Sequence, residues 1–293
     1  MASPASRCAS MAWQRWRRKR YDSFRLNCLI ASKTLAEDQP ARTVKREMKI
    51  IFSRKGFDSG SGGGPSPIID GRPITLPIPT EHRSETSYGD LGLGDYVTAA
   101  SKGRYSARSL CHHDPMFEGG RCAFGQTGAA QSHLANNNVG VGDVFLFFGL
   151  FAGPDGRDRH HRIFGYLQVD EARPIGANPT LSDQPAGFSR RHPHTLGTWN
   201  ANDTMYLGRG DLAVRADESL RLSVRGGPVS LWRVPTWLRH AGLTYHGQPE
   251  RWQGEDKLNI VARGQEFISD IGDRHDAHAW LSDMVRRLSL QSR

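Results

Sequence analysis

The alternation of apolar and polar residues predicts a strand-rich domain that begins near residue 48. An apolar run at 50–52 is typical of a strand, and the eight-residue run VFLFFGLF at 144–151 predicts a strand buried on both faces. A turn at 153–156 separates this run from the strand pattern at 162–169, so the two should form a hairpin. Further strands are expected at 204–207, 220–224, 230–234 and 265–268.

Three segments carry helical patterns. Residues 97–105 and 125–136 fit short helices, the second with Thr127 as its cap. A last helix capped by Asp276 has apolar residues at 277, 280, 281, 284, 285 and 288, the spacing of a helix that faces a core. The expected fold class is therefore α+β. It is one main domain with a mixed, strand-rich sheet or a partly closed barrel and about three helices.

The distribution of charge also divides the chain near residue 48. Residues 1–47 hold eleven Lys or Arg and four acidic residues, which is +7 of the net charge of +9. Residues 48–293 are nearly neutral and give no electrostatic indication of a nucleic-acid surface. The basic segment is expected to be a poorly ordered extension, or upstream sequence translated from a start codon assigned too early. A basic arm for nucleic acid or a membrane surface is the competing interpretation.

The glycine-rich segment from Gly56 to Gly64 follows the first predicted strand directly. It is neither a P-loop nor a dinucleotide fingerprint, because no Gly-Lys-Ser/Thr follows it and no helix pattern comes next. Glycines let a ligand approach the backbone, so the loop is a candidate anion-binding nest, with a solvated turn as the alternative. Asp58 is a candidate acid–base group. The candidate nucleotide-binding residues here are Arg54, Lys55, Ser59, Gly62, Gly63 and Ser66.

Histidines supply a second group of candidates. His112, His113 and Asp114 lie in a turn that ends in Asp-Pro, and a His-Pro-His sequence at 192–194 lies in a long loop. Imidazole and carboxylate ligate metals, but these residues do not sit on a clear helix or strand, so no metal is assigned. His113 and Asp114 are expected to serve acid–base chemistry. The remaining binding candidates are His112, Gln126, Gln131 and His133.

Established catalytic and membrane signatures do not occur in the sequence. There is no GxSxG and no paired-carboxylate motif. Cys111 and Cys122 indicate neither a disulfide nor zinc strongly, and a reducing cytoplasm is the default compartment. No apolar run reaches the roughly 18 residues of a membrane span.

Five segments together resemble one known family. They are SRKGFDSGSGGGPSPI (53–68), FGQTGAAQSHL (124–134), VGVGDVFLFFGLF (139–151), IFGYLQV (163–169) and GQEFISD (264–270). From Met48 to Leu288 the chain is similar to the third family of nucleotide-modification-associated domains. That resemblance implies a bacterial or phage setting and a role in DNA-base modification, and it assigns neither a reaction nor a cofactor. Residues 163–169 are also similar to the central hairpin of EVE, ASCH and other PUA-like barrels, which read modified bases or RNA.

Three functions are compatible with these residues. The first is a cytoplasmic domain that binds a nucleotide or a modified base between the glycine loop, the 112–114 turn and the helix near Gln126. The second is a nucleotide-modifying transferase or hydrolase, with Asp58 and His113 as acid and base and Arg54 or Lys55 on a phosphate. The third is an interaction or scaffold protein without a small-molecule site. A nucleic-acid partner fits the first two functions.

Overall fold

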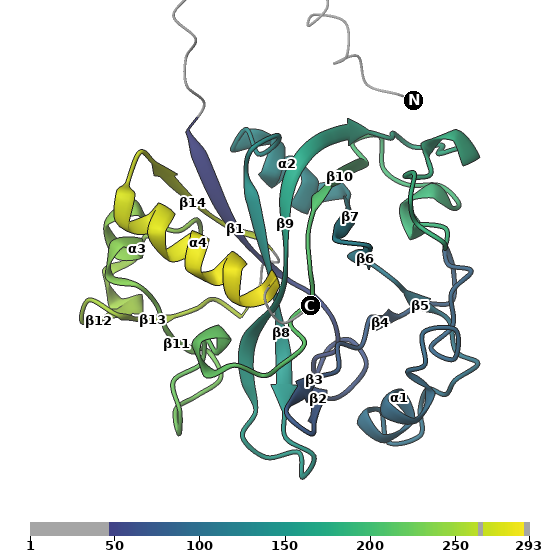
Figure 1. Cartoon of the computed structure of the whole chain (residues 1–293), viewed down its shortest axis with the longest axis horizontal. Helices are drawn as coiled ribbons and strands as arrows, with labels where there is room; N and C mark the ends of the chain where they lie inside the picture. Colours follow the sequence, from purple (N-terminus) through teal and green to yellow (C-terminus); the bar gives the residue numbers. More distant parts are fainter. Residues whose placement is uncertain (1–46, 263–265, 290–293) are drawn as a thin grey trace, which may run out of the picture. The chain divides into compact units, whose positions relative to one another are not determined.

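The computed structural model describes residues 47–262 and 266–289. The prediction of a disordered or misassigned extension falls on residues 1–46, outside the described residues. In the described part, a nine-stranded sheet has the spatial order β14-β1-β8-β9-β10-β7-β6, with β2 and β3 joined to it through β8 (Figure 1). These strands are β14 (Glu266–Gly272), β1 (Met48–Arg54), β8 (Val144–Ala152), β9 (His160–Pro174), β10 (Thr204–Arg209), β7 (Arg121–Gln126), β6 (Met116–Glu118), β2 (Ser66–Ile69) and β3 (Arg72–Pro73).

The sheet is mixed, as predicted. β1 pairs parallel with β8 and antiparallel with β14, whereas β8 and β9 form the predicted antiparallel hairpin. The sheet curls into a half-barrel within a single main α+β domain. Two small sheets flank it. They are β11-β13-β12 (Leu231–Arg233, Lys257–Asn259 and Trp252–Gln253) and β4-β5 (Ile78–Pro79 and Cys111–His112).

Strand β8 separates two hydrophobic clusters, because successive side chains of a strand point to opposite faces. Leu146 and Phe148 pack into the cluster that contains Trp232. Phe145 and Phe147 pack on the other side, with Phe124 at a ring-centroid distance of 5.1 Å from Phe145. The prediction of a strand buried on both faces is thereby confirmed.

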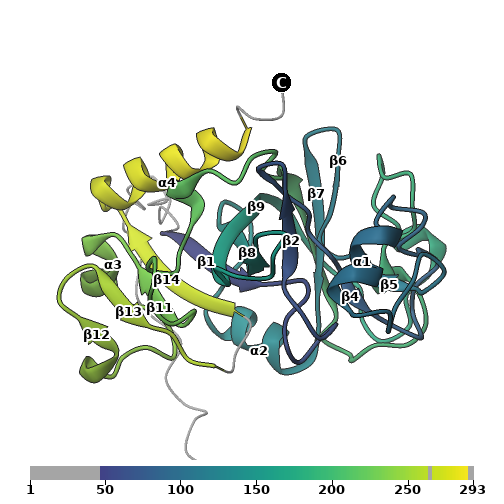
Figure 2. The same ribbon diagram turned by 90° about the horizontal axis from the view of Figure 1, so that it is seen from below.

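Helices cover both faces of the sheet. α4 (His275–Ser289) packs Ala277 and Leu281 into the cluster of Trp232, while α2 (Gly128–Asn136) lies on the opposite side, where Leu134 is buried (Figure 2). α3 (Thr236–Ala241) lies beside α4, and α1 (Gly94–Ala100) belongs to a separate cluster. The described residues thus hold four α-helices where about three were expected.

Three predicted elements are corrected by the structure. The strand expected at 220–224 is a 3₁₀ turn (Glu218–Leu220) followed by isolated bridges, because Ser223 uses its hydroxyl to bond the backbone of His161 and Val229. The helix expected from residue 125 begins at Gly128, because residues 125 and 126 still pair with β10. Asp276 lies inside α4 and accepts a hydrogen bond from the Ala277 amide.

Two chemical expectations concern cysteines and membranes. Cys111 and Cys122 are buried free thiols, and burial raises the pKa of each thiol. Among the described residues, no helix has both the length and the apolar character required to cross a membrane.

Candidate functional site

A cavity of about 230 Å³ lies between the glycine loop, β5 and the end of β7. Its wall includes members of all three segments that the sequence singled out. It also includes His194 and Trp199, which come from the long loop before β10 and were not among the predicted site residues. The predicted residues that the structure brings to this cavity are Arg54, Lys55, Asp58, His112, Asp114 and Gln126.

Gly125 is the strand position that lets this wall form. A Cβ at Gly125 would lie 2.3 Å from the His194 ring, so only glycine admits the imidazole against β7. The Gly125 amide also donates a hydrogen bond of 3.1 Å to Asp114 Oδ1. One residue without a side chain therefore positions two side chains of the cavity.

Asp114 is the centre of a histidine cluster. Its Oδ1 accepts from His192 Nε2 at 3.2 Å, and its Oδ2 lies 3.6 Å from His112 Nε2 and 3.8 Å from His194 Nε2. Burial alone would raise the pKa of the Asp114 carboxyl, but the surrounding imidazoles hold that pKa well below its ordinary value. Asp114 is therefore a buried anion that faces several potential cations.

His194 is held on both sides. Its Nδ1 lies 2.6 Å from Asp203 Oδ1, and its ring stacks on Trp199 with a centroid distance of 4.1 Å and an interplanar angle of 7°. Asp203 is fully buried, and its Oδ2 has no hydrogen-bond partner among the described residues. The Arg83 guanidinium lies over the same Trp199 ring, 4.4 Å from its centroid. The stack fixes the His194 ring in one orientation.

Glu266 links two residues of the cavity wall, Gln126 and Lys55. Its Oε1 accepts from Gln126 Nε2 at 2.7 Å and pairs with Lys55 Nζ at 3.0 Å. Glu266 Oε2 is buried without a hydrogen-bond partner among the described residues. Arg54 donates to the carbonyl groups of Val261 and Ala262, and burial lowers the pKa of its guanidinium. Both predicted phosphate-binding cations therefore already have protein partners.

His113 faces a second cavity of about 380 Å³, which shares Lys55, Gly56 and Asp114 with the first. Burial, followed by the charge of His192, lowers the pKa of His113 to about 4, so this imidazole is neutral near pH 7. Asp58 lines only the first of these two cavities. The structure thus places the predicted acid–base pair on different cavities.

Several backbone amides of the glycine loop donate to acceptors within the loop itself. Asp58 Oδ1 accepts from the amides of Gly60 and Ser61, and the Asp58 carbonyl accepts from the Gly63 amide. Gly62 has a φ of +98°, and a Cβ there would lie 2.5 Å from the Phe57 ring. These amides are directed into the loop, which leaves less of the predicted anion-binding nest for a ligand.

Six predicted binding residues do not line the first cavity. They are Ser59, Gly62, Gly63, Ser66, Gln131 and His133. Ser59 is exposed in the glycine loop, and the Ser66 hydroxyl accepts from the Leu76 amide. Gln131 Oε1 accepts from the hydroxyl of Tyr206, and His133 Nε2 lies 3.2 Å from the Thr244 hydroxyl. The side chains of Ser66, Gln131 and His133 therefore each have a hydrogen-bond partner within the protein.

Comparison with known proteins gives one match. A family model described as nucleotide modification associated domain 3 matches residues 49–270, a range that contains every residue of the cavity wall named above. Comparisons with curated proteins and with solved structures give no significant match. The family resemblance of the five sequence segments is confirmed.

Proposed function

Since this chain belongs to the family of nucleotide modification associated domain 3, we propose that it binds a nucleotide through its base, modified bases included, in the 230 Å³ cavity. Family membership links the chain to nucleotide modification in general. The base as the recognised group, and the cavity as its site, are inferences from the side chains described above. A cytoplasmic location is part of this proposal, because nucleotides and DNA are found there in a bacterial cell.

One observation carries the proposal, namely the convergence of three distant segments on one cavity. The wall that they form includes a carboxylate at Asp58, an amide at Gln126 and an ammonium group at Lys55, the last two held in place by Glu266. The edge of a base offers both donors and acceptors, and proteins read it with mixed sets of this kind. An apolar wall with only positive charge would instead favour phosphate alone.

The second cavity gives room for the rest of the ligand. Besides the shared residues, its wall includes Phe117, Phe164 and Leu212, which are apolar. Its volume of about 380 Å³ lies within the range of about 300–1,000 Å³ that is usual for small-molecule sites. A bound nucleotide can therefore extend past Asp114 from one cavity into the other.

A nucleotide-modifying enzyme is the second candidate function. It is favoured by Asp114, a buried carboxylate surrounded by imidazoles in a cavity, since such perturbed groups gather at catalytic sites. The pair of Asp58 and His113 has less geometric support because the two residues line different cavities. His112 and His194, which face Asp114, are better placed for proton transfer.

Calorimetric titration of the full chain with nucleoside monophosphates, with and without modified bases, tests the proposal. Ribose 5-phosphate, which has no base, serves as the ligand control and should bind much more weakly. Gln126→Ala should weaken binding of the best ligand about tenfold or more, because a lost hydrogen bond of about 1.4 kcal/mol corresponds to a factor of ten.

Gln253→Ala is the matched control, since Gln253 is exposed on β12 and lies outside both cavities. Its affinity should equal that of the unaltered chain. Equal binding of nucleotides and ribose 5-phosphate would contradict base recognition. No binding of any nucleotide or oligonucleotide would favour the scaffold alternative.

A further inference from the structure

We propose that His112, Asp114 and His194 bind a divalent first-row transition metal ion at the wall of the 230 Å³ cavity. The ligand atoms are His112 Nε2, His194 Nε2 and Asp114 Oδ2. This is the set of three potential ligand residues found among the described residues, and its atoms all lie within 4.8 Å of one another. The site does not depend on the proposed nucleotide, and it can be tested without one.

The spacing of the three atoms suits one ion. Zinc bonds of about 2.0–2.2 Å to nitrogen and oxygen, arranged tetrahedrally, put neighbouring ligand atoms about 3.3–3.5 Å apart. The observed separations from Asp114 Oδ2 are 3.6 Å to His112 Nε2 and 3.8 Å to His194 Nε2. These two separations are within a few tenths of an ångström of the zinc spacing. The third, between the two histidine nitrogens, is at most 4.8 Å, so movement of the imidazoles by no more than about 1.5 Å closes the set around a metal.

Asp203 fixes the protonation of His194 in the form that a metal requires. The Asp203 carboxylate lies 2.6 Å from His194 Nδ1, so that nitrogen carries the proton and donates it. The Nε2 atom is then left with its lone pair directed at Asp114 Oδ2. A buried carboxylate behind a ligating histidine is the usual support of such a ligand, because it fixes both the tautomer and the ring orientation.

The hydrogen bonds also decide which histidine stays out of the set. His192 Nδ1 accepts from the His194 amide at 3.2 Å, so the His192 proton is on Nε2 and is donated to Asp114 Oδ1. The Gly125 amide donates to the same oxygen. Oδ1 is therefore used by two donors, and Oδ2 remains for a cation.

The nature of the ligands selects the class of metal. Two imidazoles and one carboxylate suit Zn²⁺ or Fe²⁺, whereas Mg²⁺ and Ca²⁺ prefer sites made of oxygen atoms. Three protein ligands leave at least one coordination position open, which is typical of catalytic rather than structural sites. Because all three residues line the cavity, the open position faces the space proposed for the nucleotide.

The first experiment uses the unaltered full chain. After treatment with a chelator, it is titrated with Zn²⁺ by calorimetry, and the zinc environment is measured by X-ray absorption. One equivalent of zinc should bind with two imidazoles and only nitrogen or oxygen in the first shell. No binding, or a shell that contains sulfur, would overturn the proposal. In either case the cluster would be a set of histidines that contact Asp114 without a metal.

Variants then locate the ion. His112→Ala and His194→Ala should each weaken zinc binding at least about 100-fold, and Asp203→Asn should weaken it about 10–100-fold, since it removes only the supporting charge. His240→Ala is the control, because His240 is exposed on α3 and its loss should change nothing. Unchanged zinc affinity in both alanine variants would overturn the assignment.

Asp114→Asn is the variant for the case in which an alanine variant fails to fold. It keeps the shape of the side chain and the acceptor for Gly125, and it removes the negative charge from the proposed ligand. Zinc binding should fall while the thermal unfolding transition persists. Repeating the nucleotide titrations with and without zinc separates the two proposals, since either ligand can bind when the other does not.

Discussion

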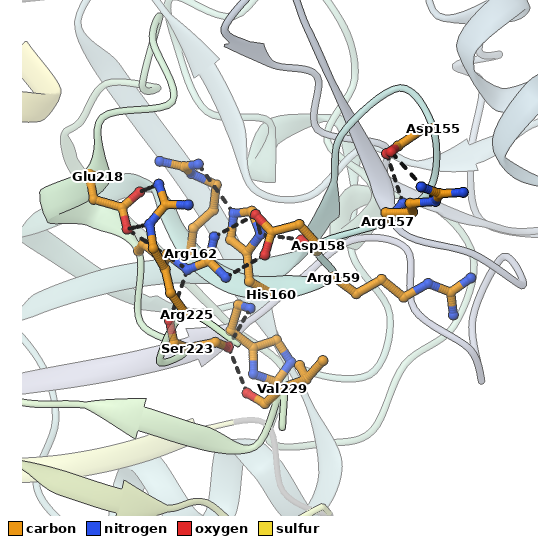
Figure 3. A network of polar contacts seen from close by, with 12 residues as sticks. Asp155, Arg157, Asp158, Arg159, His160, Arg162, Glu218, Ser223, Arg225 and Val229 are labelled. Carbon is orange, nitrogen blue, oxygen red and sulfur yellow. Dashed lines mark hydrogen bonds and ion pairs between the residues drawn. The ribbon is translucent and has the colours of Figure 1, made fainter. Parts of the chain in front are cut away.

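An arginine network and the histidine cluster both join basic side chains to carboxylates, but they differ in how completely the partners satisfy one another. The arginine network, beside the β8–β9 turn, consists of the Arg221–Asp158 and Arg225–Glu218 pairs. The histidine cluster consists of Asp114 with His112, His192 and His194. In the arginine network, Arg225 donates two hydrogen bonds of 2.8 and 2.7 Å to Glu218 (Figure 3). Arg221 makes two of the same lengths to Asp158. Every carboxylate oxygen of these two pairs has a guanidinium partner.

The histidine cluster shows the opposite condition. His112 and His194 face Asp114 Oδ2 at 3.6 and 3.8 Å, too far for hydrogen bonds, and Asp203 Oδ2 is buried without a partner among the described residues. An unsatisfied buried polar group costs about 1–3 kcal/mol in stability. Asp114 Oδ2 thus faces the cavity without a close hydrogen-bond partner, which leaves it available to a ligand, whereas the Arg221–Asp158 and Arg225–Glu218 pairs leave no carboxylate oxygen unpaired.

The largest expected effect is the loss of stability caused by His194→Ala in protein freed of metal by a chelator. This variant leaves the buried Asp203 carboxylate without its only hydrogen-bonded imidazole, and leaving a buried charged group without its hydrogen bond costs about 3 kcal/mol or more. Urea unfolding measures the loss against His240→Ala, which should be neutral. A loss below about 1 kcal/mol would show that the cluster is less tightly coupled than its geometry indicates.

The second expected effect is a pH dependence of stability caused by His161, whose amide donates to Ser223 next to the arginine network. Burial, followed by the charge of Arg54, lowers the pKa of His161 to about 3, and its Nδ1 accepts a hydrogen bond from Trp232 Nε1. As the pH falls, His161 is protonated near pH 6.5 in the unfolded chain but only near pH 3 in the folded chain. The contribution of His161 is thus fully present above pH 6.5 and is lost progressively as the pH falls toward 3.

Between pH 7 and pH 5 this linkage amounts to about 2 kcal/mol of unfolding free energy. His161→Gln keeps an acceptor for Trp232 but does not titrate, so its stability should fall by about 2 kcal/mol less over the same interval. Denaturant unfolding at both pH values gives the comparison. Parallel pH profiles of the two proteins would mean that His161 is not held neutral.

The smallest expected effect is the difference in stability loss between breaking the Arg221–Asp158 pair and breaking the Arg225–Glu218 pair. The Arg221 side chain is 5 % exposed and that of Arg225 is 69 % exposed. Arg221→Ala should cost about 1–2 kcal/mol, since its hydrogen bonds are largely shielded from water. Arg225→Ala should cost less than about 1 kcal/mol, as is usual for a surface pair. Chemical denaturation of both variants tests the order, and equal losses would contradict the role assigned to burial.

Local pattern predicted the central strands well and the element boundaries less well. β8 is a run of apolar residues between two turns, so its type and its burial follow from the sequence alone. The start of α2 does not, because pairing of Gln126 with Thr204 extends β7 to the residue before Thr127. That pairing is a tertiary contact, and it overrides the helical preference of the segment.

The candidate site was predictable in part for the same reason. The glycine loop, the 112–114 turn and Gln126 combine polar residues with conformational signals that a sequence displays. His194, Trp199 and Asp203 belong to a long loop with no hydrophobic period. Tertiary contacts bring this loop to Asp114, among them the pairing of β7 with β10. The His-Pro-His sequence was the one local signal that pointed to this loop.

The sequence separations across the cavity have a consequence for how the domain folds. The contacts that close it join Lys55 to Glu266 across 211 positions, Gln126 to Glu266 across 140, and Asp114 to His192 across 78. Contacts this distant are slow to form, because the entropy of closing long loops is lost before they stabilise the chain. We therefore expect the cavity to close late in folding, together with the equally distant pairing of β1 and β14, so recovery of ligand binding during refolding should report the complete native topology.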